Sequence, residues 1–373
     1  MATVLVTGGC GFLGSHIVDA FSAQTDFSIV CISRNPTRFR NPRATYIECD
    51  VTNYDAVTDV IDRVKPTVIV HVASPGPFAA ARAQHADYLA TKHLVDCAHN
   101  APSVKALIYS GSVGAIANVS GKAISPLKED DAILYSLSDG PAPYARVKGA
   151  SEAIVLHANA PSPDSHHISD DPSSSKQESL LTTVLRLPGV YGPRGWGGNF
   201  EFFDSANTFA TRIQLGPNEV LLDFVYVESA ALAHVLAAKT LLRGPQGTEN
   251  RVDGEAFFIT DGMPIGFWDW VRMFWKAAGD TNCEEKRWRI RIPWWIVQTI
   301  AVLCEVLTVC ITWGRKAPPF SRFHIKYMKE GGVFDIRKAK KSLDYEPLVS
   351  TEEGVRRTVA WCQEERGRRI RVK

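Results

Sequence analysis

The sequence predicts an α/β protein with a doubly wound parallel sheet and a smaller C-terminal region, and two observations predict it. Short apolar runs rich in β-branched residues alternate with segments of helical length. A glycine-rich turn joins the first of these runs to the first helical segment. Continuous apolar strands connected by helical crossovers are typical of parallel sheets that are covered on both faces.

The first strand is expected over residues 3–6, and residues 7–14 follow it with the sequence Thr-Gly-Gly-Cys-Gly-Phe-Leu-Gly. An apolar pattern of helical spacing begins within this turn and continues to Phe21. Glycines let the chain turn tightly and let a pyrophosphate approach bare backbone, while amides at the helix N-terminus donate hydrogen bonds to it. We therefore predict a Rossmann domain that binds a dinucleotide. The contacts expected from this turn are Gly8, Gly11, Phe12, Leu13 and Gly14.

Further strands are expected over residues 28–32, 46–49, 68–72, 107–109 and 183–185. The segment 161–179, rich in Ser, Asp, Pro and His, lies before the last of these strands, and we expect a solvated inserted loop there. Its adjacent His166 and His167 have no partner cluster, so an exposed pair is favoured over a metal site.

Length and composition are those of a globular enzyme, with 373 residues of which 45% are hydrophobic and 22% charged. We predict a dinucleotide-binding domain over residues 1–185, with the inserted loop at 160–180. Residues 186–373 are expected to form a substrate-binding region that is partly interleaved with the first domain.

The formal net charge of +2 gives no indication of a nucleic-acid partner. Eight cysteines are scattered, with no C-x-x-C pair and no cysteine–histidine cluster at metal-ligand spacing. They are interpreted as reduced thiols on the cytosolic side of any membrane, and no metal is expected. Because the first strand begins at residue 3, we expect no signal peptide.

The end of the second strand bears on the choice of cofactor. An acidic residue about 20 positions after the glycines binds the ribose 2′-hydroxyl of NAD, whereas arginine accommodates the 2′-phosphate of NADP. Here the strand ends with Ser33 and Arg34 and has no acid, which favours NADP over NAD. The alternative is that Arg34 is a surface arginine and that NAD is accepted. Further cofactor contacts are expected after the third and fourth strands, at Asp50, Val51, Ala73 and Ser74.

Tyr144 and Lys148 are candidate catalytic residues. They lie four positions apart in the sequence and so share one face of a helix. The ammonium can lower the pKa of the phenol from about 10 toward the working range, so that the phenolate accepts the proton of an alcohol. Ser112, near the end of the fifth strand, can hydrogen-bond the same substrate oxygen. Such a pair is common on helix surfaces, but after a glycine-rich turn and beside a strand-end serine it indicates an active site.

With these motifs, the chain resembles the extended short-chain dehydrogenases, and within them the 3β-hydroxysteroid dehydrogenase group. The resemblance is greatest to sterol-4α-carboxylate 3-dehydrogenases (decarboxylating) of fungal type. Beyond the glycine turn and the Tyr144 and Lys148 pair, it rests on segments at 185–193, 223–228, 254–260, 267–268, 345–347 and 352–355.

The resemblance implies that Ser112, Tyr144 and Lys148 form the catalytic set, with Lys148 also holding the nicotinamide ribose. It implies a further cofactor contact at Pro188. Two positions depart from the family pattern. An acid is common where Ser33 stands, and asparagine is usual at the helix position of Asp87.

The implied reaction is oxidation of the 3-hydroxyl of a 4-carboxy sterol or triterpenoid to a ketone with NADP or NAD. The resulting β-keto acid loses carbon dioxide because the electrons left behind enter the ketone as an enolate. Ser112 and Tyr144 are expected to stabilise that oxyanion.

The segment 292–313 is apolar apart from Glu305 and lies between the basic segments 286–291 and 315–316. About 20 apolar residues can span a bilayer, but a carboxylate near the middle costs roughly 2.5–3.5 kcal/mol. Tryptophans at both ends equally suit an interfacial helix, and the alternative is a buried helix of the substrate region. We expect docking on the cytosolic face of the endoplasmic reticulum membrane, with a cytoplasmic enzyme as the alternative. The tryptophans are Trp294, Trp295 and Trp313.

Three other functions stay open. A ketosteroid or flavonoid-type reductase would use the same residues in the opposite direction, and NADP would favour it. A nucleotide-sugar epimerase requires a polar, arginine-rich pocket, whereas the C-terminal half is rich in Trp, Phe and Ile. A non-catalytic module that senses dinucleotide is opposed by the intact Ser112, Tyr144 and Lys148. A homodimer is left open as the assembly.

Overall fold

The structure, a computed structural model, describes residues 1–122, 125–160, 180–195, 198–244, 250–281, 290–313, 318 and 320–372. Most of the predicted inserted loop, with its histidine pair, lies outside the described residues. The same is true of residues 286–289 and 315–316 in the basic flanks of the apolar segment. The backbone amide of Ala160 donates to the carbonyl of Leu180 at 2.9 Å, so these two residues lie side by side.

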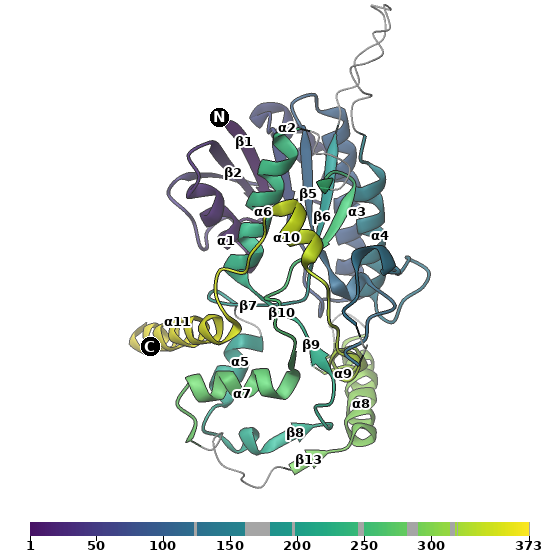
Figure 1. Cartoon of the computed structure of the whole chain (residues 1–373), viewed down its shortest axis with the longest axis vertical. Helices are drawn as coiled ribbons and strands as arrows, with labels where there is room; N and C mark the ends of the chain where they lie inside the picture. Colours follow the sequence, from purple (N-terminus) through teal and green to yellow (C-terminus); the bar gives the residue numbers. More distant parts are fainter. Residues whose placement is uncertain are drawn as a thin grey trace, which may run out of the picture.

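A seven-stranded sheet forms the upper half of the molecule (Figure 1). Its order is β11-β6-β5-β4-β1-β2-β3, and every neighbouring pair is parallel. The strands are β1 (Ala2–Thr7), β2 (Phe27–Ser33), β3 (Ala44–Glu48), β4 (Val68–His71), β5 (Ala106–Ser112), β6 (Leu181–Leu187) and β11 (Glu255–Phe258). The predicted α/β class with a parallel doubly wound sheet is therefore confirmed.

Helices cover both faces of this sheet. One face carries α1 (Phe12–Ser22), α6 (Val227–Leu242) and α10 (Arg337–Leu343), which share a buried aliphatic core with β1 and β4. The other face carries α2 (Tyr54–Val64), α3 (Ala81–Asn100) and α4 (Pro143–His157) over a second core. Local sequence defines α2 at both ends. At its start, the Asn53 side chain accepts a hydrogen bond from the Ala56 amide at 3.1 Å. At its end, the backbone of Lys65 adopts the left-handed conformation directly before Pro66.

The sheet is completed by residues far along the chain. Strand β11 pairs with β6 from Glu255 opposite Thr183 to Phe258 opposite Arg186. Between these two strands in sequence, the chain builds part of the lower half of the molecule and then returns through α6. The N-terminal and C-terminal regions are interleaved in this way, while the boundary at residue 185 remains a prediction.

The lower half of the molecule is organised around an aromatic core. Trp270 stacks on Phe224 with ring centroids 4.2 Å apart, and Tyr191 and Phe274 pack edge-on against Trp270. The remaining elements are η1 (Val113–Ala115), η2 (Glu129–Asp131), β7 (Gly189–Tyr191), α5 (Gly198–Ser205), η3 (Phe209–Arg212), β8 (Ile213–Leu215), β9 (Leu221–Leu222), β10 (Phe224–Tyr226), β12 (Ile265–Gly266), α7 (Phe267–Ala277), β13 (Ile290–Ile292), α8 (Trp294–Thr312), α9 (Arg322–Glu330) and α11 (Thr351–Val372).

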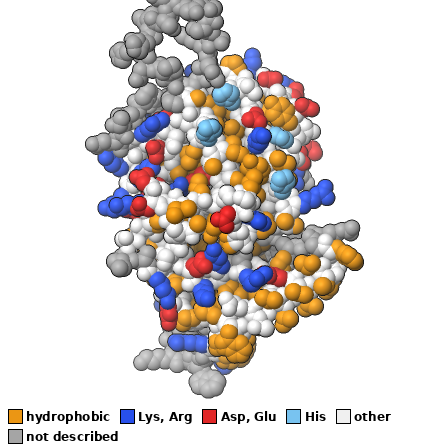
Figure 2. All heavy atoms as spheres, turned by 90° about the vertical axis from the view of Figure 1, so that its right-hand side faces the viewer, with side chains coloured by type: hydrophobic (Ala, Val, Ile, Leu, Met, Phe, Trp, Pro, Cys, Tyr) orange, Lys and Arg blue, Asp and Glu red, His pale blue; other side chains and the backbone are white. Residues whose placement is uncertain are grey.

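Helix α8 occupies the predicted apolar segment and lies largely outside the core. Only Val297 and Ala301 on it are buried, and they pack against Ile325 of α9. Its length and mean hydropathy of 1.9 are sufficient to cross a membrane. A wholly buried core helix is therefore wrong for this segment. Hydrophobic side chains gather on the lower part of the face shown in Figure 2. The exposed apolar residues of the segment are Trp295, Ile300, Val302, Leu303, Val306, Leu307, Val309, Ile311 and Trp313.

Candidate active site

The glycine turn connects β1 to α1 with very close backbone packing. Gly8 has a φ of +69°, and a Cβ there would lie 2.9 Å from the Cα of Ala73. A Cβ on Gly14 would lie 2.2 Å from the Gly8 carbonyl oxygen, so neither position admits a side chain. Helix α1 begins at Phe12 after Gly11 and has no side-chain cap, which leaves its first amides as donors. This cradle fits the pyrophosphate of a dinucleotide.

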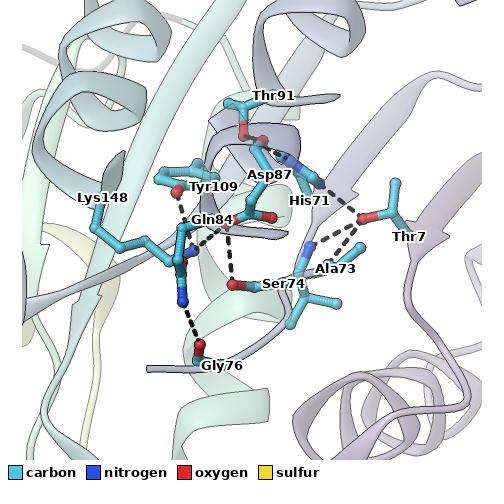
Figure 3. A network of polar contacts seen from close by, with 11 residues as sticks. Thr7, His71, Ala73, Ser74, Gly76, Gln84, Asp87, Thr91, Tyr109 and Lys148 are labelled. Atoms are coloured by element: carbon cyan, nitrogen blue, oxygen red, sulfur yellow. Dashed lines mark hydrogen bonds and ion pairs between the residues drawn. The ribbon is translucent and has the colours of Figure 1, made fainter. Parts of the chain in front are cut away.

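Thr7 holds the ends of β1 and β4 together where the strand order reverses. Its Oγ1 accepts from the amides of Val72 and Ala73, both at 3.1 Å, and contacts Nδ1 of His71 at 2.8 Å (Figure 3). The predicted contact Ala73 therefore lies directly beside Gly8 at the carboxyl edge of the sheet. In open α/β sheets, ligands bind at this reversal point.

The predicted contacts on β2 and β3 reach the same edge. Ser33 is the last residue of β2 and is partly exposed, and Arg34 beyond it is exposed. Oδ1 of Asp50 accepts from the amide and hydroxyl of Thr52, at 3.0 and 2.9 Å, so this carboxylate also caps its own turn. Val51 beside it is partly buried.

Three further arginines, which the sequence patterns do not single out, lie near the glycine turn. Arg38 and Arg194 both approach the ring of Phe39, with guanidinium carbons 5.1 and 5.5 Å from its centroid. Arg40 exerts a Coulombic effect on the Cys10 thiol inside the turn. Because these arginines come from the loop after β2 and from the segment after β7, only the folded chain reveals that they are neighbours.

Tyr144 and Ser112 meet around Gly114. A Cβ on Gly114 would lie 3.2 Å from Cε1 of Tyr144 and 3.4 Å from Oγ of Ser112. Ser112 is the last residue of β5, and its Oγ accepts from the Gly114 amide at 3.1 Å. Tyr144 lies in the first turn of α4, which starts at Pro143. Pro188, also predicted, is buried directly after Leu187, the residue paired with Ser112 across the strands.

Lys148 lies one turn beyond Tyr144 and is almost completely buried. Its Nζ donates to Oη of Tyr109 at 3.0 Å and lies 3.7 Å from Oδ2 of Asp87. Burial lowers the pKa of Lys148, but Coulombic attraction to Tyr109 and Asp87 outweighs burial and raises the pKa above its usual range. Tyr144 contributes to the same rise, so its phenol lies within electrostatic reach of the ammonium.

Tyr144 also lines an open cavity of about 670 Å³. Its other walls are the segment 77–80 with the first residue of α3, residues 141–143, and side chains of α8 and α9. The exposed apolar helix thus borders the cavity at the tyrosine. No group of three or more His, Cys, Asp or Glu side chains suited to a metal ion occurs in the part of the chain that the structure describes.

Lys326 of α9 is the partly buried cation of this cavity. Its Nζ donates to Oη of Tyr135 at 3.0 Å and lies 3.5 Å from the Glu330 carboxylate. The Tyr135 backbone packs directly on α4, since a Cβ on Gly149 would lie 2.1 Å from its carbonyl oxygen. An ammonium therefore stands beside the helix that carries Tyr144 and Lys148, a feature that the sequence does not reveal.

Similar proteins are found over nearly the whole length of the chain. Residues 5–291 match the 3-beta hydroxysteroid dehydrogenase/isomerase family. The chain is 30% identical to the decarboxylating sterol-4-alpha-carboxylate 3-dehydrogenase of Candida albicans, over 98% of this chain and 99% of that protein. It is 26% identical to the Mus musculus protein of the same description, over 95% of this chain and 89% of that protein.

Solved structures agree in fold. The UDP-glucose 4-epimerase of Thermotoga maritima aligns with a TM-score of 0.67 at 21% identity, over 97% of this chain and 99% of that one. The enzyme WbmH of Bordetella bronchiseptica, solved in complex with NAD⁺, aligns with a TM-score of 0.66 at 17% identity, over 98% and 99%. The chain belongs to the 3-beta hydroxysteroid dehydrogenase/isomerase family and is an NAD(P)-dependent dehydrogenase of that family.

Proposed function

We propose that this dehydrogenase oxidises the 3-hydroxyl of a 4-carboxy sterol or triterpenoid to a ketone, and that the carboxyl group then leaves as carbon dioxide. The observation that carries the proposal is the full-length similarity to decarboxylating sterol-4-alpha-carboxylate 3-dehydrogenases. The cavity at Tyr144, with an exposed apolar helix on one side and a partly buried lysine on another, supports it.

Tyr144 acts as the general base in this proposal. Its phenolate, stabilised by the nearby ammonium of Lys148, accepts the proton of the 3-hydroxyl group. The bound nicotinamide supplies the acceptor for the hydride of the carbinol carbon. Ser112 donates a hydrogen bond to the same oxygen and orients the substrate. Lys148, with the glycine turn and Ala73, Ser74 and Pro188, holds the cofactor.

The decarboxylation requires an acceptor for electrons. When the bond to the carboxyl carbon breaks, its electron pair passes into the ketone as an enolate, whose oxygen becomes negative. Ser112 and the now protonated Tyr144 donate hydrogen bonds to that oxygen. Protonation of the enolate carbon then gives the ketone product.

Lys326 is the group we assign to the substrate carboxylate. Its ammonium has three protons, and Tyr135 and Glu330 take two of them. A carboxylate on the carbon next to the reacting hydroxyl can accept the third. The other cations of the cavity are less suited, because Arg322 is bound to Glu305 and Lys329 is exposed to solvent.

Helix α8 is proposed to dock the enzyme on the cytosolic face of the endoplasmic reticulum membrane. Trp295 and Trp313 are exposed near its two ends, whereas Trp294 packs inward against Gly216. Basic residues flank the segment in the sequence. Exposed apolar helices with tryptophan ends and basic flanks suit the membrane interface. A membrane-dissolved substrate would then enter the adjoining cavity without crossing water.

For the cofactor we propose NADP at least as readily as NAD. No acid stands at the end of β2 to repel a 2′-phosphate, and Arg34, Arg38 and Arg40 are all close in sequence to that end. This feature also favours a second candidate, an NADPH-dependent ketosteroid or flavonoid-type reductase that runs the hydride transfer in reverse.

The purified enzyme should be incubated with 4-carboxy sterols, 4-carboxy triterpenoids and matched 3-ketones, each with NADP, NAD or their reduced forms. Formation of reduced cofactor together with carbon dioxide and a product smaller by the carboxyl group supports the proposal. Reduction of ketones without carbon dioxide release would favour the reductase. Absence of turnover on all of them would contradict both.

A further inference from the structure

Asp87 of α3 is a buried carboxylate beside the lysine of the active site. Its Oδ2 lies 3.7 Å from Nζ of Lys148 and accepts from Oγ of Ser74 at 3.1 Å (Figure 3). The side chains of both ion-pair partners are only 5% exposed. Removing two charges from water is costly unless each has partners, so an ion pair in this place requires an explanation.

The position of Asp87 is fixed by contacts that lead back to the glycine turn. Its backbone carbonyl accepts from Oγ1 of Thr91 at 3.0 Å, and Thr91 contacts Nε2 of His71 at 3.1 Å. His71 in turn contacts Thr7 at the end of β1. The carboxylate is therefore held rigidly relative to both the cofactor cradle and α4.

The groups around Lys148 differ in charge. Around the pair are Tyr109 of β5, His71 of β4, Ser74 after β4 and Tyr144 of α4. Burial, with the nearby Lys148, lowers the pKa of His71 to about 3, so this imidazole is neutral near neutral pH. Among these neighbours, Asp87 is therefore the carboxylate whose negative charge balances the Lys148 ammonium.

Burial raises the pKa of the Asp87 carboxyl, and attraction to Lys148 and the hydrogen bond from Ser74 act against that rise. Each charge of the pair therefore depends on the other. An ammonium favours a neighbouring phenolate by Coulombic attraction, and a carboxylate beside that ammonium cancels part of this effect.

We propose that Asp87 is a positioning residue that restrains Lys148 and partly neutralises it, and thereby sets the pH at which Tyr144 begins to accept the substrate proton. The inference rests on the proposed function, in which Tyr144 is the base. A neutral residue at position 87 would leave the ammonium uncompensated, so that proton transfer begins at lower pH.

The test is the pH dependence of kcat/KM for alcohol oxidation by Asp87→Asn. This substitution keeps the shape of the side chain and an oxygen that can accept from Ser74. We expect the acidic limb to move to lower pH by about one unit, the order of shift that the loss of one nearby charge produces. Asp87→Glu retains the charge and should leave the limb close to that of the wild type.

Asp253→Asn is the matched control. It removes a carboxylate that is paired with Arg251 at 2.9 Å. Asp253 lies just before the start of β11, so it is at the amino-terminal ends of the strands, whereas the active site is at their carboxyl ends. Its acidic limb should coincide with that of the wild type. An unchanged or upward-shifted limb in Asp87→Asn, with cofactor affinity retained, would overturn the inference.

Folding of each variant is checked by thermal unfolding, and Asp87→Ala serves as a second neutral variant. If both neutral variants fail to fold while Asp87→Glu folds, the carboxylate is structural and the inference is wrong. Tyr144→Phe separates this outcome from failure of the proposed function. Retained activity in Tyr144→Phe refutes the base itself, whereas lost activity with an unshifted Asp87→Asn profile refutes only the role of Asp87.

Discussion

Glu305 of α8 is bound through both carboxylate oxygens by Arg322 of α9. Oε1 accepts from the Arg322 backbone amide at 2.7 Å, and Oε2 accepts from its Nε at 2.8 Å. Both residues line the cavity at Tyr144. The one charged side chain of α8 is thus directed toward α9 and the cavity, and the helix can present an uncharged face on its other side. This arrangement favours interfacial docking of α8 over spanning.

Replacing Trp295, Ile311 and Trp313 together by Ser should release the enzyme from membranes. These side chains are 68%, 76% and 87% exposed, and burying one large apolar side chain contributes about 1.5–3 kcal/mol. Vesicle sedimentation should show a loss of binding of at least about tenfold, and KM should rise for membrane-borne substrate but not for a water-soluble analogue.

The matched control for that variant is Ile133→Ser with Leu348→Ser, two exposed apolar residues that lie outside α8. This double variant should sediment with vesicles as the wild type does. Wild-type protein that stays entirely in the soluble fraction, without detergent or aggregation, would refute the docking proposal.

Tyr144→Phe should lower turnover by about 10²-fold or more, the usual effect of removing a general base. Its affinity for the cofactor, measured by fluorescence titration of the reduced form, should be nearly unchanged. Lys148→Ala should impair both quantities, since the ammonium serves the phenolate and the ribose. A Tyr144→Phe enzyme with more than about a tenth of wild-type activity is incompatible with the assignment.

The wild type should bind NADP at least as tightly as NAD, and Ser33→Asp should shift the preference to NAD. A carboxylate at position 33 repels the 2′-phosphate and can bind a 2′-hydroxyl instead. Arg38→Ala should weaken NADP and leave NAD nearly unaffected. Calorimetric titration of both cofactors checks these expectations, and a wild type strongly selective for NAD would contradict them.

Lys326→Met should raise KM for a 4-carboxy substrate by about tenfold or more, because a charge-assisted hydrogen bond contributes roughly 1.5–3 kcal/mol. Oxidation of a 3-hydroxy sterol that lacks the carboxyl group should be little affected. Lys329→Met removes an exposed ammonium from the same cavity and is the control. Equal losses on both substrates would show that Lys326 supports the fold and does not recognise the carboxylate.

The contribution of Asp223 to the stability of the folded state should decrease as the pH rises. Burial raises the pKa of its carboxyl to about 7, above the unfolded value of about 3.9. Between these values the folded state keeps a proton that the unfolded state has lost, so this contribution to stability falls as the pH rises through the interval. The free energy of unfolding of Asp223→Asn, relative to the wild type, should therefore increase from pH 5 to pH 8. A difference that does not vary with pH would contradict this expectation.

The sequence predicts those features that neighbouring residues determine. The apolar runs and the glycine turn fix β1, β2 and α1 locally, and the helical spacing of Tyr144 and Lys148 brings both to one face of α4. The parallel sheet follows because most strands are separated from the next by a crossover long enough for a helix, although residues 34–43 between β2 and β3 form no helix.

Features that depend on distant segments could not be predicted. The sequence contains no sign that Tyr109 of β5 binds Lys148 or that Arg194 approaches the loop after β2. The pattern of α8 is equally compatible with a core helix, and only the packing of α9 decides which side chains it covers. Lys326 lies 178 positions after Lys148, and the fold alone brings the two to neighbouring elements.

The position of β11 in the sheet has a consequence for folding of the chain during translation. The outer edge of β6 stays unpaired until residues 255–258 have been made and have left the exit tunnel. An exposed edge strand can pair with another chain, so a nascent chain is open to aggregation during this interval. Pauses in translation before residue 258 should therefore reduce the yield of soluble enzyme more than later pauses.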